Sequence, residues 1–261
     1  GPTFTKVRKA MTMFQEYQVE YNILTTVNRK NCSEPLSVYN FLKESGVEFI
    51  QFIPIVEREA NDLSKELGLH LSTPEQSPTD TVPVTEWSVD PEEYGKFLID
   101  IFEQWVRNDI GKVFVMNFEW ALSSAINGVS GVCQFAPQCG NAGIIEHNGD
   151  IYSCDHYVYP EYKIGNIVTD DPSSLFNSEQ QKQFGKNKKE AFSRECLGCS
   201  VLPLCYGGCP KHRFVNSQNY LCAGYKAFFN HLIPYIDVSR KLINERRPLT
   251  DLMKMADSIS N

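Results

Sequence analysis

Apolar residues in the first part of the chain alternate between helical and strand patterns. In residues 3–18 they recur at helical spacing, which predicts a first helix. Residues 19–28 and 47–56 are dense in β-branched and apolar side chains and predict buried strands, with a helix at 35–45 between them. This order, with continuously apolar strands, is typical of parallel α/β packing.

The pattern changes after the second strand. Residues 57–89 are rich in Pro, Thr and Ser and have neither period, which predicts a long loop or insertion. A helix is then expected from Pro91 to about residue 108, because Asp90 suits the N-cap and proline suits the first helical position. A short strand at 112–118 and a short helix at 119–127 follow.

Residues 129–222 have a different texture, with short elements and eight of the nine cysteines. Two apolar stretches within 142–154 are joined by Asn148-Gly149, which predicts a tight hairpin because Asn-Gly accepts positive φ angles. Residues 223–243 predict a long helix, and a further short helix is expected after Pro248.

Composition and charge narrow the function classes. The chain has 261 residues, of which 42% are hydrophobic and 22% charged, as in ordinary globular proteins. A net charge of −7 argues against nucleic acid and anionic membranes as partners, and the basic run 181–190 is predicted to be a solvated helix end. The sequence contains neither an apolar run of about 18 residues nor a secretory signal, which predicts a cytoplasmic location.

The cysteines are the main candidates for chemistry, because clustered cysteines in a reducing compartment are more often metal ligands than disulfides. Eight of them are spaced C-x5-C-x14-C and C-x2-C-x5-C-x3-C-x12-C: Cys133, Cys139, Cys154, Cys196, Cys199, Cys205, Cys209 and Cys222. Eight thiolates suffice for two four-cysteine sites, and spacing alone favours iron–sulfur clusters over zinc and zinc over disulfides. Gly207-Gly208 would let the backbone pass close to an inorganic core, and Cys32 is expected to be a small buried residue.

These cysteines lie in motifs that resemble a known family. The motifs are CQFAPQCG, GDIYSCDHYVYP, IGNI and CLGCSVLPLCYGGCPKHR, followed by Cys222. They resemble the SPASM region of radical SAM enzymes, most closely the anaerobic sulfatase-maturating enzymes, and earlier segments resemble the later βα units of the same enzymes. The resemblance implies an α/β fold with three parts: the C-terminal βα units of a partial (β/α) barrel at 1–128, a SPASM auxiliary-cluster domain at 129–222 and a C-terminal helical segment at 223–261.

The resemblance also implies specific site residues. It implies two auxiliary [4Fe–4S] clusters, the first held by Cys133, Cys139, Cys154 and Cys209, the second by Cys196, Cys199, Cys205 and Cys222. Asp155 matches the proposed catalytic base, and Ile50 matches a position beside the adenine of S-adenosyl-L-methionine (SAM). An ordinary aspartate pKa of about 3.9 lies far below a thiol pKa of about 8.5, so burial of Asp155 or acidification of the thiol must narrow the difference. On the residues alone, Asp155 is a turn cap and Ile50 a core residue.

One motif of the family is missing from these residues. The family holds its SAM cluster with C-x3-C-x2-C, whereas Cys205 and Cys209 have the first spacing and position 212 is histidine. We therefore expect a C-terminal fragment that is inactive alone, with SAM and a third [4Fe–4S] cluster bound only in the full-length enzyme.

The function implied by the resemblance is oxidation of a sulfatase cysteine or serine to formylglycine. The implied partners are a sulfatase polypeptide and an electron donor such as flavodoxin or ferredoxin. Two alternatives stay open at this stage. One is another SPASM peptide-modifying enzyme, for example one that forms thioethers, and the other is a zinc-binding interaction module without catalysis.

Overall fold

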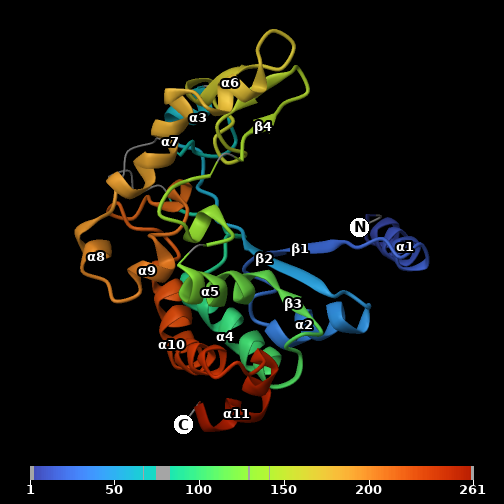
Figure 1. The fold of residues 1–261 in the computed structure, drawn as a ribbon. Helices are drawn as coiled ribbons and strands as arrows, with labels where there is room; N and C mark the ends of the chain where they lie inside the picture. Colours follow the sequence, from blue (N-terminus) through green and yellow to red (C-terminus); the bar gives the residue numbers. More distant parts are fainter. Residues whose placement is uncertain (1–2, 67, 75–82, 129, 141, 260–261) are drawn as a thin grey trace.

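The computed structural model contains a parallel and an antiparallel sheet, each of three strands within the described residues. The parallel sheet and its helices form one part of the molecule, and the cysteine-rich segments lie beside them (Figure 1). The residues described are 3–66, 68–74, 83–128, 130–140 and 142–259. The predicted loop at 57–89 therefore lies partly outside them.

The parallel sheet confirms the α/β prediction. Its strands are β1 (Asn22–Val27), β2 (Phe49–Pro54) and β3 (Phe114–Val115), in the order β1-β2-β3. Ile50 pairs with Ile23 on one side and with Val115 on the other. Buried and half-buried residues alternate along β2, so one face of this strand is covered more completely than the other. The prediction of a fully buried strand was wrong for β1, where Leu24 is 59% exposed.

Helices on that one face supply most of the core. They are α2 (Pro35–Glu44), α4 (Pro91–Asn108), α5 (Met116–Asn127) and α10 (Cys222–Asn244). Asp90 caps α4 as predicted, since its side chain accepts hydrogen bonds from the backbone N–H groups of Glu92 and Glu93. The helix α5 begins at Met116, three residues before the predicted start, because β3 contains only two residues.

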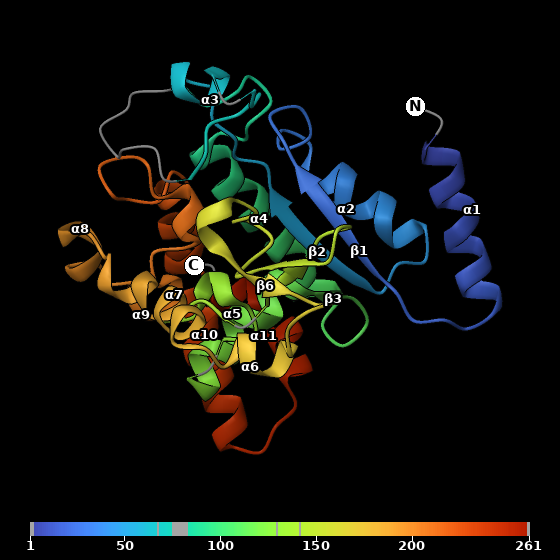
Figure 2. The ribbon, with the colours of Figure 1, turned by 90° about the horizontal axis from the view of Figure 1, so that it is seen from above.

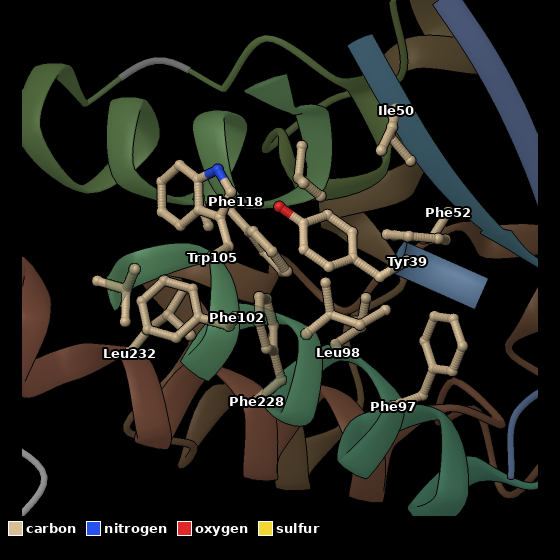
Figure 3. Packing of buried hydrophobic residues seen from close by; sticks show 14 of the residues in the cluster. Tyr39, Ile50, Phe52, Phe97, Leu98, Phe102, Trp105, Phe118, Phe228 and Leu232 are labelled. Carbon is tan, nitrogen blue, oxygen red and sulfur yellow. The ribbon is translucent and has the colours of Figure 1, made fainter. Parts of the chain in front are cut away.

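Aromatic side chains join α4, α5 and α10. The ring of Phe102 meets those of Phe118 and Tyr235 edge to face, at centroid distances of 5.3 and 4.9 Å. Trp105 is buried beside them, and its indole N–H donates to the carbonyl of Val113 at 2.7 Å (Figure 3). Edge-to-face pairs of this kind add to the stabilisation from burial, so this cluster holds α10 firmly against α4.

The first helix, α1 (Thr3–Glu16), forms as predicted but outside this core. Of its apolar residues, only Met11 is buried. Phe4 is 58% exposed and contacts Phe41 of α2 at a centroid distance of 6.3 Å. Both views show α1 at the outer side of the sheet, beyond β1 (Figures 1 and 2). Its apolar stripe therefore lies mostly at the surface.

The described part of 57–89 has more structure than predicted. It contains α3 (Asp62–Glu66) and two antiparallel bridges, Arg58 with Val84 and Glu59 with Leu71. Arg58 is buried, lies 4.8 Å over the ring of Phe214 and donates from Nη2 to the carbonyl of Thr73. The segment thus packs against the cysteine-rich region, and composition could not reveal these distant contacts.

The cysteine-rich region is built from a small sheet and short helices. The predicted hairpin is confirmed, with β4 (Ile144–Ile145) antiparallel to β5 (Asp150–Tyr152) and Gly149 at φ +86° in the turn. The other elements are β6 (Lys163–Asn166), η1 (Cys133–Phe135), η2 (Pro160–Tyr162), η3 (Pro210–His212), α6 (Pro172–Phe176), α7 (Glu179–Glu190), α8 (Arg194–Leu197) and α9 (Leu202–Cys205).

The chain closes with α10, then η4 (Leu249–Asp251) and α11 (Leu252–Ile259), as predicted after Pro248. The helix α11 packs against α4 and α10. None of the helices in the described part of the chain has both the length and the apolar character needed to cross a membrane.

Candidate metal centres

Four cysteines surround a cavity of about 160 Å³ near the start of α10. They are Cys196, Cys199, Cys205 and Cys222. Ser193 caps the short helix α8 by accepting from the N–H of Cys196, and the N–H of Cys199 donates back to the carbonyl of Cys196 at 3.1 Å. This tight C-x2-C turn directs two sulfurs to one side, and α9 and α10 supply the other two.

A turn with three consecutive positive φ angles separates Cys205 from Cys209. The angles are 44° at Tyr206, 68° at Gly207 and 62° at Gly208. A Cβ on Gly208 would lie 2.5 Å from Nδ2 of Asn219, so both conformation and space require glycine there. The turn lets neighbouring cysteines of one motif line two different cavities.

The other four cysteines line a second cavity, of about 260 Å³. They are Cys133, Cys139, Cys154 and Cys209, which form the first cysteine set. The four cysteines around the cavity of about 160 Å³ form the second set. The open face of the parallel sheet forms part of the same wall through Gln51 and Ile53. Because this cavity lies between the sheet and the cysteine-rich region, a molecule on the sheet would meet the first cysteine set directly.

Asp155 and His156 also line this second cavity. The thiol of Cys154 donates to Oδ1 of Asp155 at 3.2 Å, and Nδ1 of His156 lies 3.3 Å from the sulfur of Cys209. The structure thus places the carboxylate predicted to be the base beside Cys154, and His156 beside Cys209. The catalytic role of Asp155 stays a prediction, as do the two ligand sets.

Ile50 does not line either cavity. It has no exposed surface and packs in the core between the sheet and the helices (Figure 3). Its neighbours Gln51 and Ile53 point to the opposite face, because successive strand residues alternate in direction. They are better placed than Ile50 to touch a bound molecule, and the predicted contact of Ile50 with adenine stays untested.

Burial disfavours the charged form of several of the thiols when no metal compensates their charge. Burial raises the pKa of Cys205 and of Cys209 to about 12. Burial also raises the pKa of the Cys154 thiol. Metal ligation needs thiolates, and the positive charge of iron or zinc would supply the compensation. The donor set therefore fits a thiolate-bound metal group.

The spacing of the ligand atoms distinguishes a single ion from a cluster. Tetrahedral zinc with bonds of about 2.3 Å brings its sulfurs to about 3.8 Å from one another. Among the described residues, the one group of three or more ligand atoms lying within 4.8 Å of one another is Cys154, Asp155 and His156, with a single sulfur. Within the described residues, neither set of four cysteines is gathered as tightly as a single zinc ion requires.

Two basic residues of the site were missed by the sequence interpretation. Residues 181–190 were expected to be a solvated helix end, but they form most of α7, and Lys188 in it is 1% exposed. Arg213, just after η3, donates to the carbonyls of Tyr206 and Gly207 and so holds the turn between Cys205 and Cys209. The available signal for Lys188 was its helical spacing from Gln181 and Gly185, the other two buried residues of α7.

Comparison with known proteins supports a relationship over nearly the whole chain. Residues 133–200 match the family model SPASM, described as an iron-sulfur cluster-binding domain. A serine-type anaerobic sulfatase-maturating enzyme of Bacteroides thetaiotaomicron is 39% identical over 98% of this chain and 62% of its own length. A cysteine-type enzyme of Clostridium perfringens is 29% identical over 89% of this chain and 59% of its own length.

The fold matches as well. A solved structure titled as native anSMEcpe with bound AdoMet and Cp18Cys peptide superposes with a TM-score of 0.76 at 27% identity, covering 92% of this chain and 63% of that one. The chain therefore spans a little more than half to somewhat under two thirds of the relatives it matches. These matches confirm both the resemblance to anaerobic sulfatase-maturating enzymes and the predicted fold class.

Proposed function

We propose that this chain is the auxiliary-cluster and substrate-holding part of a radical SAM enzyme that oxidises a sulfatase cysteine or serine to formylglycine. The observation that carries the proposal is the pair of separate cavities, each lined by one complete set of four cysteines. In this proposal the first set and the second set each hold one [4Fe–4S] cluster. When bound, the clusters supply sites that accept electrons from the substrate.

The residues around the second cavity have definable roles in this reaction. Oxidation of a substrate cysteine removes a Cβ hydrogen atom, a thiol proton and a second electron, and hydrolysis follows. In our proposal the carboxylate of Asp155 takes the thiol proton, because it lines the cavity between the sheet and the first cysteine set. The apolar side chains of Leu24, Ile53 and Trp120 line the same cavity and would shield the reacting group from water.

The radical-generating step requires residues outside these 261. Position 212 is histidine, so Cys205 and Cys209 do not continue into C-x3-C-x2-C. We propose that SAM and a third [4Fe–4S] cluster are bound by the longer protein, with a flavodoxin or ferredoxin as electron donor. The chain alone is then inactive as a maturase, and formylglycine made by it from a sulfatase peptide would contradict this part of the proposal.

Metal content tests the cluster proposal directly. The chain is purified without oxygen and reconstituted with iron and sulfide, and metals are measured. We expect about eight irons per chain and a broad absorption band at about 400 nm, as for two cubane clusters. Stoichiometric zinc in place of iron would favour the interaction-module alternative and overturn the proposal.

Substrate choice separates the maturase from other SPASM peptide modifiers. A longer protein with the C-x3-C-x2-C motif is incubated with SAM and a sulfatase peptide, and products are identified by mass spectrometry. Formylglycine is the expected product, and a thioether crosslink would instead support the alternative enzyme. Asp155→Asn should abolish formylglycine but leave the iron content unchanged, which separates a catalytic from a ligating role.

A further inference from the structure

Lys188 is a buried cation whose hydrogen bonds, among the described residues, go to backbone carbonyls. Its Nζ donates to the carbonyls of Cys133, Gln134 and Ala136 at 2.7, 2.8 and 2.6 Å, which uses all three ammonium protons. Within the described part of the chain, no carboxylate forms an ion pair with it. The side chain of Lys188 thus links α7 to the η1 turn that contains Cys133.

Arg213 is a second cation of this kind. Its guanidinium donates to the carbonyls of Lys188, Gly207 and Tyr206 at 2.7, 3.1 and 3.0 Å. It lies 5.1 Å over the ring of Phe192 and likewise has no carboxylate partner among the described residues. Because it bonds to the backbone of Lys188, the two cations form one connected unit between α7 and the turn after Cys205.

Burial of unpaired positive charge normally destabilises a fold, because hydrogen bonds to neutral carbonyls replace only part of the lost hydration. The chain has a net charge of −7 and therefore more carboxylates than basic side chains. Burial of these two cations without a carboxylate partner is notable for that reason. The groups able to carry negative charge that interact electrostatically with the two cations are cysteines. Lys188 interacts electrostatically with Cys133, Cys139 and Cys209, all of the first set. The groups around Arg213 come from both sets: Cys196, Cys139, Cys209 and Cys205.

We propose that Lys188 and Arg213 are positioning residues that supply internal counter-charge to the thiolate-ligated clusters, Lys188 for the first cysteine set and Arg213 for both. The inference rests on the proposed cluster binding. Four thiolates on a [4Fe–4S] core leave net negative charge that the two cations offset inside the protein. The same hydrogen bonds hold Cys133 and the Gly207-Gly208 turn in place for ligation.

The counter-charge role has a consequence for redox behaviour. Reduction adds one negative charge to a cluster, and a nearby buried cation stabilises that reduced state. Removal of the charge should shift the reduction potential of the neighbouring cluster to more negative values. A merely structural role would not alter the potential of a cluster that is still fully bound.

Four variants separate charge from hydrogen bonding. Lys188→Met removes both, whereas Lys188→Gln keeps donors for the carbonyls but lacks the charge. Arg213→Gln makes the corresponding change at the cation that lies near cysteines of both sets. Lys189→Met is the matched control, because Lys189 is the next residue on α7 and is exposed. Each 261-residue chain is reconstituted anaerobically, and we measure iron per chain and cluster potentials by an electron paramagnetic resonance titration.

The expected results are specific to each set. Lys188→Met should lose about half of the iron, and Lys188→Gln should keep more iron but titrate at a more negative potential for one cluster. Arg213→Gln should shift both potentials, and Lys189→Met should match wild type. If Lys188→Met does not fold, the cluster reduction potential measured in Lys188→Gln tests the inference.

Two outcomes would overturn the inference. The first is full iron content with unchanged potentials in both Lys188 variants. The second is a Lys188→Gln protein whose bound clusters keep the wild-type potentials. That result would mean that Lys188 acts through its hydrogen bonds and not through its charge. A wild-type chain that binds no iron would overturn the proposed function itself, so the two failures are distinguishable.

Discussion

Gly95 of α4 and Gly224 of α10 are in direct backbone contact. A Cβ added to Gly95 would lie 2.6 Å from the Cα of Gly224, and one added to Gly224 would lie 2.0 Å from the carbonyl oxygen of Pro91. Cys222 begins α10 two residues before this crossing. The close approach of the two helices therefore fixes where a cysteine of the second set stands relative to the core.

Gly224→Ala should be strongly destabilising for this reason. The added methyl group would overlap backbone atoms, which cannot move aside as a flexible side chain can, so we expect a loss of about 3 kcal/mol in the free energy of unfolding. Denaturant unfolding of the metal-free chain measures it. Gly198→Ala is the control, because a Cβ there meets only the carbonyl of Arg194 at 3.8 Å. Equal stability of the two variants would contradict a tight crossing.

The ion pair between Glu57 and Lys211 joins the chain after β2 to the segment after Cys209. Its atoms Oε1 and Nζ are 2.8 Å apart, and both side chains are mostly buried. A double-mutant cycle with Glu57→Gln and Lys211→Met should give a coupling energy of about 1 kcal/mol, since partial burial limits screening by water. The matched pair is Glu179 with Lys182, also 2.8 Å apart but exposed. Coupling no larger than in that pair would show that the contact does not hold the two regions together.

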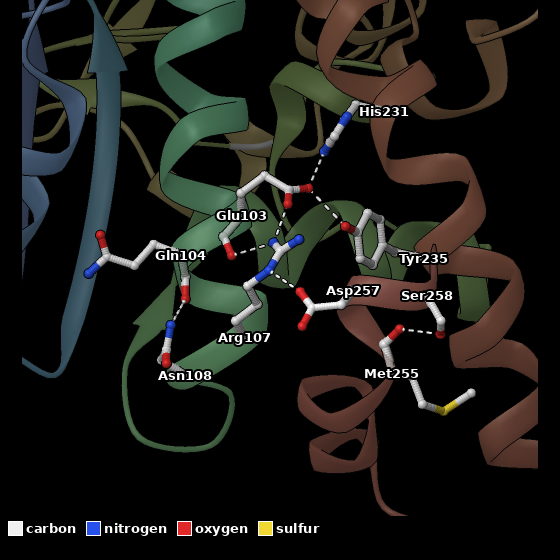
Figure 4. Close-up of polar contacts among 9 residues, drawn as sticks. All are labelled: Glu103, Gln104, Arg107, Asn108, His231, Tyr235, Met255, Asp257 and Ser258. Atoms are coloured by element: carbon white, nitrogen blue, oxygen red, sulfur yellow. Dashed lines mark hydrogen bonds and ion pairs between the residues drawn. The ribbon is translucent and has the colours of Figure 1, made fainter. Parts of the chain in front are cut away.

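Glu103 links α4 to α10 and should make stability depend on pH. Its carboxylate accepts hydrogen bonds from Tyr235 at 2.8 Å, from His231 at 2.5 Å and from Arg107 (Figure 4). Burial alone would raise the pKa of the Glu103 carboxyl, but these hydrogen bonds outweigh burial and hold that pKa below its usual value of 4.5. A carboxyl with a depressed folded-state pKa stabilises the fold above its unfolded pKa, and this contribution is lost as the pH falls through the folded value.

Glu103→Gln should therefore lower the free energy of unfolding at pH 7 by about 2 kcal/mol, because charge-assisted hydrogen bonds are lost. The difference from wild type should shrink as the pH falls below about 4.5. Urea unfolding across this range measures both. Asp257→Asn is the comparison, because its side chain pairs with the same Arg107 but is 92% exposed. A difference that stays constant with pH would refute the role of the charge.

Local signals in the sequence predicted local structure well. The Asp90 cap and the Asn148-Gly149 turn need only neighbouring residues, and both are confirmed. Burial was harder to predict, because it depends on what covers an element. The strands β1 and β2 have similar apolar patterns. Every second residue of β2 is buried, whereas Leu24 of β1 is largely exposed.

Lys188 shows the same limit at the candidate site. It stands in a run that contains four lysines, and composition alone makes that run a solvated surface. Its partners Cys133 and Ala136 lie more than 50 positions earlier in the chain. Spacing likewise predicted two sets of four cysteines, but it could not show which loops meet. The assignment of each cysteine to one of the two sets came from the family resemblance.

Single cysteine replacements should remove one cluster at a time. Cys209 lines the cavity of the first set and Cys222 that of the second. Cys209→Ala and Cys222→Ala should each lower the iron content from about eight to about four per chain, and the two variants should lose different resonance signals. Cys32→Ala is the control, because that thiol is buried beside Glu93 and lines neither cavity. Loss of all iron in either variant would mean that the eight cysteines form one interdependent site.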